Sequence, residues 1–162
     1  MAKEIERKFL VDMVNGKLLH RKSTISRIEQ TYLRAFEGER RVRKRTTDNI
    51  VDFFYTEKFG TGLTRVENER KISEKEFNEL MKEADQNLHT VKKVRYTFSY
   101  KKQIFELDVY DFCSTHATME IELHDENQTI QLPPFVHILK EITEDKRFKN
   151  RKLAETLIIP VE

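Results

Sequence analysis

Charged side chains recur at every second position along most of the extended stretches of this chain, and this alternation limits the fold more than any other feature. In residues 3–11, Glu4, Glu6 and Lys8 share one face of the expected strand, and apolar residues fall largely on the other. Side chains two positions apart lie roughly 6.5–7 Å from each other. Three charged groups at that spacing can contact one ion or one polyanion. One such stretch alone is also typical of an ordinary surface strand.

The pattern repeats along the chain and predicts eight strands. They are expected at about residues 3–11, 27–36, 40–46, 50–58, 63–72, 90–100, 104–111 and 118–124. A short helix fits residues 12–22. A longer one should follow the capping box at Ser73, with an apolar stripe from Phe77 to Leu88. One or two short helices are expected after Pro133-Pro134, the last near residues 150–157.

The later strands align charged residues of both signs on one face, with apolar residues behind them. The aligned residues are, strand by strand, Arg41, Arg43 and Arg45; Thr56 and Lys58; Arg65, Glu67, Glu69 and Lys71; Lys93 and Arg95; Glu106 and Asp108; Glu120 and Glu122. Two architectures satisfy this pattern. A sheet can pack its apolar face on helices and expose its charged face to water. Alternatively, eight antiparallel strands can close into a barrel with the charges inside and the helices packed outside, which also removes exposed edges.

Composition excludes several classes of protein. Charged residues make up 36% of the 162, yet the formal net charge is only +2, which argues against a protein that coats nucleic acid by bulk charge. The single cysteine, Cys113, excludes an intrachain disulfide and fits a reducing compartment. With no apolar signal core and no long apolar run, a cytoplasmic protein is expected, without a membrane partner. The mean hydropathy of −0.69 disfavours a membrane barrel.

Several short motifs in order along the chain resemble the CYTH proteins, also called triphosphate tunnel metalloenzymes. Glu4-Ile5-Glu6-Arg7-Lys8 matches the ExExK signature of that family. The other matching motifs are Gln30-Thr31-Tyr32-Leu33, Arg41-Val42-Arg43, Thr56-Glu57-Lys58, Arg65-Val66-Glu67-Asn68-Glu69, Lys93-Val94-Arg95-Tyr96, Glu106-Leu107-Asp108-Val109-Tyr110, Met119-Glu120-Ile121-Glu122-Leu123, Glu141-Ile142-Thr143, Arg147-Phe148-Lys149-Asn150 and Leu153-Ala154. The resemblance implies one domain over residues 1–162, mainly β (α+β), built as an eight-stranded antiparallel tunnel that binds a triphosphate with divalent metal.

The resemblance also implies roles for the aligned charges. Arginine offers phosphate a planar fork, and lysine offers a compact point charge. The expected substrate-binding residues are Lys8, Arg41, Arg43, Lys58, Arg65, Lys93 and Arg95. Paired carboxylates hold hard cations such as Mg²⁺ or Mn²⁺. The expected metal ligands are Glu4, Glu6, Glu67, Glu69, Asp108, Glu120 and Glu122. Glu106 is expected to contact one of the ligands and not the metal itself. Glu4, Glu6 and Lys8 are the expected catalytic residues.

The resemblance therefore implies a metal-dependent hydrolase of a triphosphate, with inorganic tripolyphosphate as the first substrate to consider. Thiamine triphosphatase and class IV-type adenylate cyclase activities use the same family tunnel, and fold cannot choose among them. A non-catalytic module that binds polyphosphate or nucleotide is a further alternative. The expected partner is a small-molecule triphosphate, without nucleic acid. The oligomeric state, a homodimer included, stays open.

The remaining features point to no second function. The basic run from Arg40 to Arg45 resembles a nucleic-acid patch, but strand alternation divides it between two faces. The five histidines show no metal-ligand spacing. Cys113 lies in a predicted turn and has no paired base in the sequence. The connection 111–117 lacks the glycines expected in the family. Its hairpin geometry is therefore expected to differ from that of the family.

Overall fold

The computed structural model describes residues 2–60 and 64–161, and within them the chain is mainly β. The strands are β1 (Ala2–Asp12), β2 (Thr24–Leu33), β3 (Glu39–Thr47), β4 (Ile50–Phe59), β5 (Thr64–Ile72), β6 (Val91–Tyr100), β7 (Gln103–Tyr110), β8 (His116–Glu122) and β9 (Ile138–Glu141). The helices are α1 (Gly16–Lys22), α2 (Glu74–Met81) and α3 (Asn150–Thr156), with a 3-10 turn, η1 (Lys146–Phe148). In the described part of the chain, no helix is long and apolar enough to cross a membrane.

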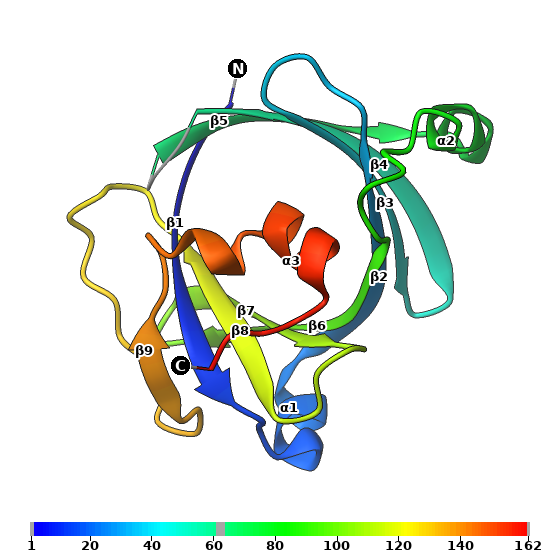
Figure 1. Cartoon of the computed structure of the whole chain (residues 1–162). Coiled ribbons are helices and arrows are strands. Elements are labelled where there is room, and N and C mark those ends of the chain that lie inside the picture. The colour runs from blue at the N-terminus through cyan, green and yellow to red at the C-terminus, as the bar shows by residue number, and fades with distance from the viewer. Residues whose placement is uncertain (1, 61–63, 162) are drawn as a thin grey trace.

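The strands form one antiparallel sheet in the order β5-β4-β3-β2-β6-β7-β8-β1-β9. Strand β1 pairs through residues 2–5 with β5 and through residues 6–12 with β8. Figure 1 shows β1 to β8 curving around a central space. Residues opposite each other in an antiparallel ladder point to the same side of the sheet. The sheet therefore has an inner face toward this space and an outer face away from it.

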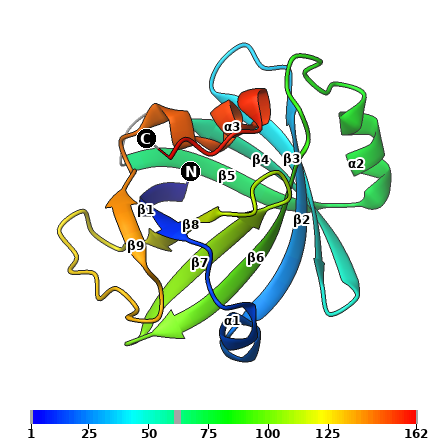
Figure 2. The ribbon, with the colours of Figure 1, turned by 60° about the horizontal axis from the view of Figure 1, so that its bottom comes forward.

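Most of the hydrophobic core lies on the outer face. Leu19 of α1 and Val136 of the connection 123–137 pack with Phe9, Phe105 and other apolar residues of β1 and β6 to β8. A second cluster joins Phe77, Leu80 and Met81 of α2 to the outer side of β2 to β5. Figures 1 and 2 show α1 and α2 outside the strands. Burial of each large apolar side chain contributes about 1.5–3 kcal/mol, so the outer face supplies much of the stability.

Helix α3 departs from the expectation that the helices pack outside. Figures 1 and 2 show it across one end of the space that the curved sheet surrounds. Leu153 and Ala154 are fully buried there against Tyr32, Val91 and Tyr110. These inward-facing positions carry apolar or aromatic side chains instead of charges. The apolar inner rim at this end thus needs a cover, and η1 with α3 provides it.

Two further elements differ from the sequence-based expectation. The sheet contains nine strands instead of eight, because the short β9 pairs with Phe9, Leu10 and Val11 of β1. Helix α2 ends at Met81, so the predicted stripe toward Leu88 does not continue as helix. Ala84 instead forms a β-bridge with Leu33. Backbone hydrogen bonds to the end of β2 therefore replace the next helical turn.

Two connections between strands show where the backbone requires glycine and where it does not. The connection 111–117 contains no residue with positive φ, so its lack of glycine requires no strain. Gly38, in contrast, has a φ of 64°, and a Cβ built there would lie 2.3 Å from the backbone oxygen of Lys58. Glycine at 38 therefore permits close packing of the β2–β3 connection on β4. Thr61, Gly62 and Leu63, predicted to break and restart the pattern, lie outside the described residues.

Candidate functional site: a charged cavity inside the curved sheet

The inner faces of the strands line an open cavity of about 350 Å³ whose described lining is charged except for one amide. Strands β1 and β3 to β8 contribute, and where one strand gives several residues they alternate along it, as the sequence pattern predicts. The lining residues are Glu6, Arg41, Arg43, Arg45, Lys58, Glu67, Glu69, Arg95, Glu106, Glu120, Glu122 and Asn150. A cavity with this lining suits a small, highly charged ligand that carries its own cations.

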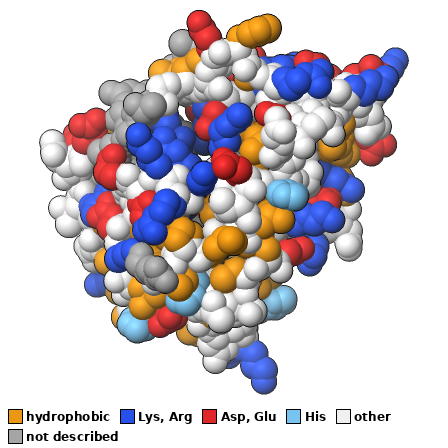
Figure 3. Space-filling view, in the orientation of Figure 1, with side chains coloured by type: hydrophobic (Ala, Val, Ile, Leu, Met, Phe, Trp, Pro, Cys, Tyr) orange, Lys and Arg blue, Asp and Glu red, His pale blue; other side chains and the backbone are white. Residues whose placement is uncertain are grey.

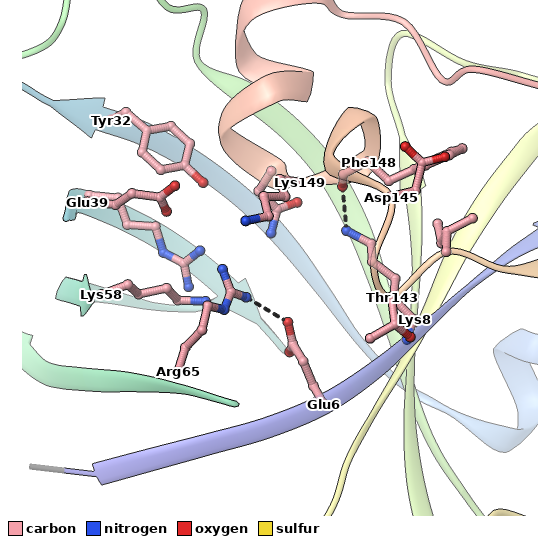
Figure 4. Close-up of a pocket in the computed structure, with 13 residues that line it drawn as sticks. Glu6, Lys8, Tyr32, Glu39, Lys58, Arg65, Thr143, Asp145, Phe148 and Lys149 are labelled. Carbon is pink, nitrogen blue, oxygen red and sulfur yellow. Dashed lines mark hydrogen bonds and ion pairs between the residues drawn. The ribbon is translucent and has the colours of Figure 1, made fainter. Parts of the chain in front are cut away.

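A smaller cavity of about 40 Å³ lies beneath η1 and α3 and shares Glu6, Arg41, Lys58 and Asn150 with the first. Figure 4 shows Lys8 and Glu6 of β1 facing it from one side and Lys58 and Arg65 from the other. Figure 3, viewed toward this end, shows basic and acidic side chains gathered beside the η1–α3 segment. The two cavities therefore form the covered and the open parts of one charged interior.

Lys8 is held by the segment that covers this end. Its Nζ donates a hydrogen bond of 2.8 Å to the backbone oxygen of Phe148 and lies 3.4 Å from Glu120 Oε1. On the same strand, Glu6 accepts a hydrogen bond of 2.9 Å from Arg65. Figure 4 draws both of the hydrogen bonds as dashed lines. The cations Lys8 and Arg65 thus lie beside carboxylates in the ligand-free interior.

The cations of β6 are compensated by a buried carboxylate of β7. Asp108 accepts two hydrogen bonds from Arg95, at 2.8 and 2.9 Å, and its second oxygen lies 2.7 Å from Lys93 Nζ. Burial opposes ionisation of Asp108, but Arg95 and Lys93 outweigh burial and hold its pKa well below the ordinary value. Glu106 also accepts from Arg95, at 3.0 Å. Both Asp108 oxygens are therefore engaged by protein cations.

Lys93 remains difficult to ionise despite this partner. Its side chain is fully buried. Burial, together with the nearby charges of Arg95 and Arg43, lowers the pKa of Lys93 from 10.5 to about 7, although Asp108 opposes the shift. The ammonium of Lys93 therefore titrates near neutral pH.

The arginines of β3 are not compensated in the same way. Within the described residues, Arg43 forms no ion pair and its Nε has no hydrogen-bond partner. Burial, and then repulsion by Arg41 and Arg95, lowers the pKa of Arg43 to about 9. Glu69 and Asp108 attract Arg43 but do not offset burial and this repulsion. Arg41 lies 3.9 Å from Glu67. A buried guanidinium that forms no ion pair is costly, so this wall is suited to receive an anionic ligand.

The carboxylates face one another across strands. In the antiparallel register Glu6 lies opposite Glu122, and Glu106 lies opposite Glu120. Like charges directly opposite each other destabilise a sheet, which a bound cation would relieve. Burial raises the pKa of Glu120, but Lys8 and Arg95 outweigh it and lower that pKa to about 2. Glu120 is therefore ionised at neutral pH.

The remaining predicted carboxylates are distributed along β5 and β1. Glu67 and Glu69 line the open cavity, and Glu69 accepts a hydrogen bond of 3.0 Å from Thr56. The side chain of Glu4 lies outside the described part of the structure. Among the residues that are described, no three acidic, histidine or cysteine side chains converge into a preformed metal cluster. Oxygen donors from opposite walls nevertheless fit a hard cation in their chemistry.

The structure adds residues that the charge pattern did not assign. Asn150 lines both cavities, Tyr32 lines the covered one and Arg45 lines the open one. Gln30 is fully buried opposite Arg43 in the register, and both polar atoms of its amide lack hydrogen-bond partners among residues 2–60 and 64–161. Position alone identifies Arg45, since it continues the row of Arg41 and Arg43. Charge alternation does not identify Asn150, although Asn150 lies in the motif Arg147-Phe148-Lys149-Asn150 that resembles the family.

Comparison with known proteins identifies the class. The sequence model of the CYTH domain matches residues 2–156, and the chain belongs to the CYTH domain family. It is 34% identical over 155 residues to the inorganic triphosphatase of Nitrosomonas europaea, covering 93% of this chain and 96% of that one.

Solved structures agree with this assignment. The structure of the inorganic triphosphatase NE1496 is similar with a TM-score of 0.59 and 30% identity, covering 99% of this chain and 98% of that one. The PH1819 protein from Pyrococcus horikoshii OT3 has a TM-score of 0.55 at 17% identity, over 76% of this chain and 80% of its own. At that identity the second structure supports the fold alone.

Proposed function

We propose that this protein is a divalent-metal-dependent triphosphatase that hydrolyses a phosphoric anhydride bond of inorganic tripolyphosphate. The observation that carries the proposal is Arg43, a buried guanidinium that faces the open cavity and forms no ion pair with any residue in the described part of the chain. The name and similarity of the Nitrosomonas europaea relative support the same reaction. The single domain, residues 1–162, would act as a tunnel that holds the triphosphate between its inner walls.

The inward-facing cations would bind the phosphate oxygens. Arg41, Arg43 and Lys58 lie on the β3–β4 side of the open cavity, and Arg95 lies on β6. Lys8 and Arg65 face the covered part, and Lys93 lies fully buried beside Asp108. Guanidinium forks give directional hydrogen bonds to phosphate, and the lysines add point charges. Opposed cations would hold the chain of phosphates in line for attack by water.

The carboxylates of the cavity would hold Mg²⁺ or Mn²⁺. The proposed ligands are Glu4, Glu6, Glu67, Glu69, Glu120 and Glu122. The bound cation would neutralise phosphate charge and make a bound water more acidic. Glu4, Glu6 and Lys8 remain the proposed catalytic residues, with Lys8 turning from Phe148 toward phosphate. Asp108, with both oxygens engaged, would position Lys93 and Arg95.

The same geometry argues against nucleic acid as the partner. Arg41, Arg43 and Arg45 line the cavity. Arg40 instead contacts Tyr55 and Glu83. The basic run therefore does not form one exposed patch, and a compact polyanion is the ligand that this arrangement favours.

Phosphate release from tripolyphosphate, ATP and thiamine triphosphate tests the proposal, each with Mg²⁺ and with Mn²⁺. We expect release to be fastest with tripolyphosphate, to stop with EDTA and to return with added metal. Full activity after exhaustive metal removal would contradict the metal assignment. Cyclic AMP formed from ATP would identify a cyclase instead, and binding without turnover would identify a binding module.

A further inference from the structure

Arg45 is the third inward-facing arginine of β3, and the proposed mechanism does not use it. It lines the same open cavity as Arg43 and Glu106. Arg41 lines both parts of the interior, whereas Arg45 lines only the open part. Arg45 lies four positions further along the strand, roughly 13–14 Å from Arg41. It is therefore the cation of β3 farthest from the η1–α3 cover.

Hydroxyl groups hold the Arg45 side chain in place. Its Nε donates a hydrogen bond of 3.1 Å to Ser26 Oγ, and Ser26 Oγ lies 2.7 Å from Thr47 Oγ1. Ser26 is fully buried. Since Nε alone is engaged by residues that the structure describes, the two terminal nitrogens of the guanidinium retain their hydrogens for another acceptor.

The charge of Arg45 has no acidic partner in the part of the chain that the structure describes. Asp52 lies opposite Arg45 in the β3–β4 register, but its carboxylate pairs with Lys71 at 2.9 Å. Arg95, in contrast, is bound by Asp108 and Glu106. Arg45 is thus a positioned cation with donors available on the open side of the interior.

The shape of the interior determines which part of a substrate reaches this cation. The covered part measures about 40 Å³ beneath η1 and α3, against about 350 Å³ for the open part. An organic group attached to a triphosphate is too large for the covered part and must extend through the open part. The phosphate that carries the organic group in such an ester is a terminal phosphate in inorganic tripolyphosphate.

We propose that Arg45, oriented by Ser26 and Thr47, binds the outermost phosphate of inorganic tripolyphosphate and so selects it over triphosphate esters such as ATP. This inference rests on the proposed function and names a specificity-determining residue for it. A terminal phosphate carries more negative charge and more unesterified oxygens than the ester phosphate of a nucleotide. Arginine can donate to two phosphate oxygens at once. Its positive charge is attracted more strongly by the terminal phosphate, which carries the higher negative charge.

The test compares tripolyphosphate with ATP in the parent, Arg45→Ala and Arg45→Lys. We expect Arg45→Ala to lower the ratio of kcat/KM for tripolyphosphate to that for ATP at least tenfold, through a higher KM for tripolyphosphate. Arg45→Lys should restore part of this ratio because it keeps the charge. Lys44→Ala, next to Arg45 on the opposite face of β3, is the matched control and should leave the ratio unchanged. Ser26→Ala should give an intermediate loss, because it removes the orienting hydroxyl but keeps the guanidinium.

A purely structural role would lower both activities by the same factor, and that result would overturn the proposal, as would an unchanged ratio. The affinities for both ligands, measured by calorimetry without added metal, give the same ratio independently of turnover. Absence of turnover in the parent would contradict the proposed function alone. An affinity ratio unchanged by Arg45→Ala would contradict the proposed role of Arg45 but not the proposed function.

Discussion

The β3 wall and the β6–β7 wall of the interior both bury cations, but they differ in how the charge is balanced. On β6, Arg95 and Lys93 share the carboxylate of Asp108 at 2.7–2.9 Å. On β3, Arg43 has no ion pair among the described residues, and repulsion by Arg41 and Arg95 adds to the burial that lowers its pKa. One wall is neutralised by the protein, and the other is left for a ligand.

Because of this difference, substitutions on the two walls can distinguish buried charges that stabilise the fold from buried charges that bind the ligand. Removing one member of a buried ion pair leaves its partner unpaired, which costs stability. Removing a buried cation that has no partner relieves the protein of that cost. Two arginines of similar burial should therefore respond to substitution in opposite ways.

The largest expected effect comes from comparing Arg95→Met with Arg43→Met. Arg95→Met should lower the free energy of unfolding by about 3–5 kcal/mol, because Asp108 loses its bidentate partner. Arg43→Met should leave ligand-free stability equal or higher while it weakens tripolyphosphate binding. Urea unfolding without ligand measures the first effect, and calorimetry measures the second. Equal destabilisation by both substitutions would show that the two walls do not differ.

Ligand-linked stability sharpens the same comparison. A triphosphate that binds only the folded protein should stabilise the parent by about 2.7 kcal/mol at a hundredfold excess over its dissociation constant. Arg43→Met should lose most of this gain at the same ligand concentration. Thermal melts with and without tripolyphosphate plus Mg²⁺ provide the measurement. A parent melting temperature that does not respond to millimolar ligand would contradict binding in the interior.

The pKa of Lys93, on the β6–β7 wall, predicts that ligand binding is coupled to proton uptake. Its pKa of about 7 means that most ligand-free molecules carry a neutral Lys93 at pH 8. A bound polyanion favours the charged ammonium, so binding at pH 8 should take up as much as about one proton, and less below pH 7. Calorimetry in buffers of different ionisation enthalpy measures this uptake. Lys93→Met is the control, because it should remove the uptake and leave any protonation change of the phosphate itself.

The smallest expected effect concerns the carboxylates. Glu122→Gln removes a like-charge pair with Glu6, so it should raise ligand-free stability by about 0.2–1 kcal/mol. The same substitution should lower metal affinity and most of the activity, with partial rescue by excess Mn²⁺. Melting curves and metal titrations test both parts. Unchanged metal dependence would remove Glu122 from the proposed ligand set.

The sequence predicted which side chains face inward but not which of them meet. Alternation was sufficient for Arg41, Arg43 and Arg95, because the period of a strand depends only on local geometry. The repulsion between Arg43 and Arg95 depends on the strand order β3-β2-β6, which joins segments that are not consecutive. Nothing local in the sequence specifies that order.

The position of α3 was missed for a related reason. Leu10 and Val91 interrupt the charged alternation at one end of the inner face, and both are buried under the C-terminal segment. This interruption would predict an apolar cover only if Leu10 and Val91 were known to lie at the same end of the inner face. The early end of α2 likewise depends on tertiary bonds, since Asp85 N donates to the backbone oxygen of Tyr32.

The pairing of β1 has a consequence for how the chain is made. Among the nine described strands it is synthesised first, yet its partners are β5, β8 and β9, and two of these lie in the last third of the given sequence. At 5–20 residues per second, a nascent β1 waits on the order of ten seconds for β8. During that interval Phe9, Leu10 and Val11 would be an apolar segment that lacks its partners in β8 and β9. Glu6, Arg7 and Lys8 precede them directly, and such charges oppose pairing between chains. The residues proposed to serve catalysis would thus also protect the growing chain from aggregation.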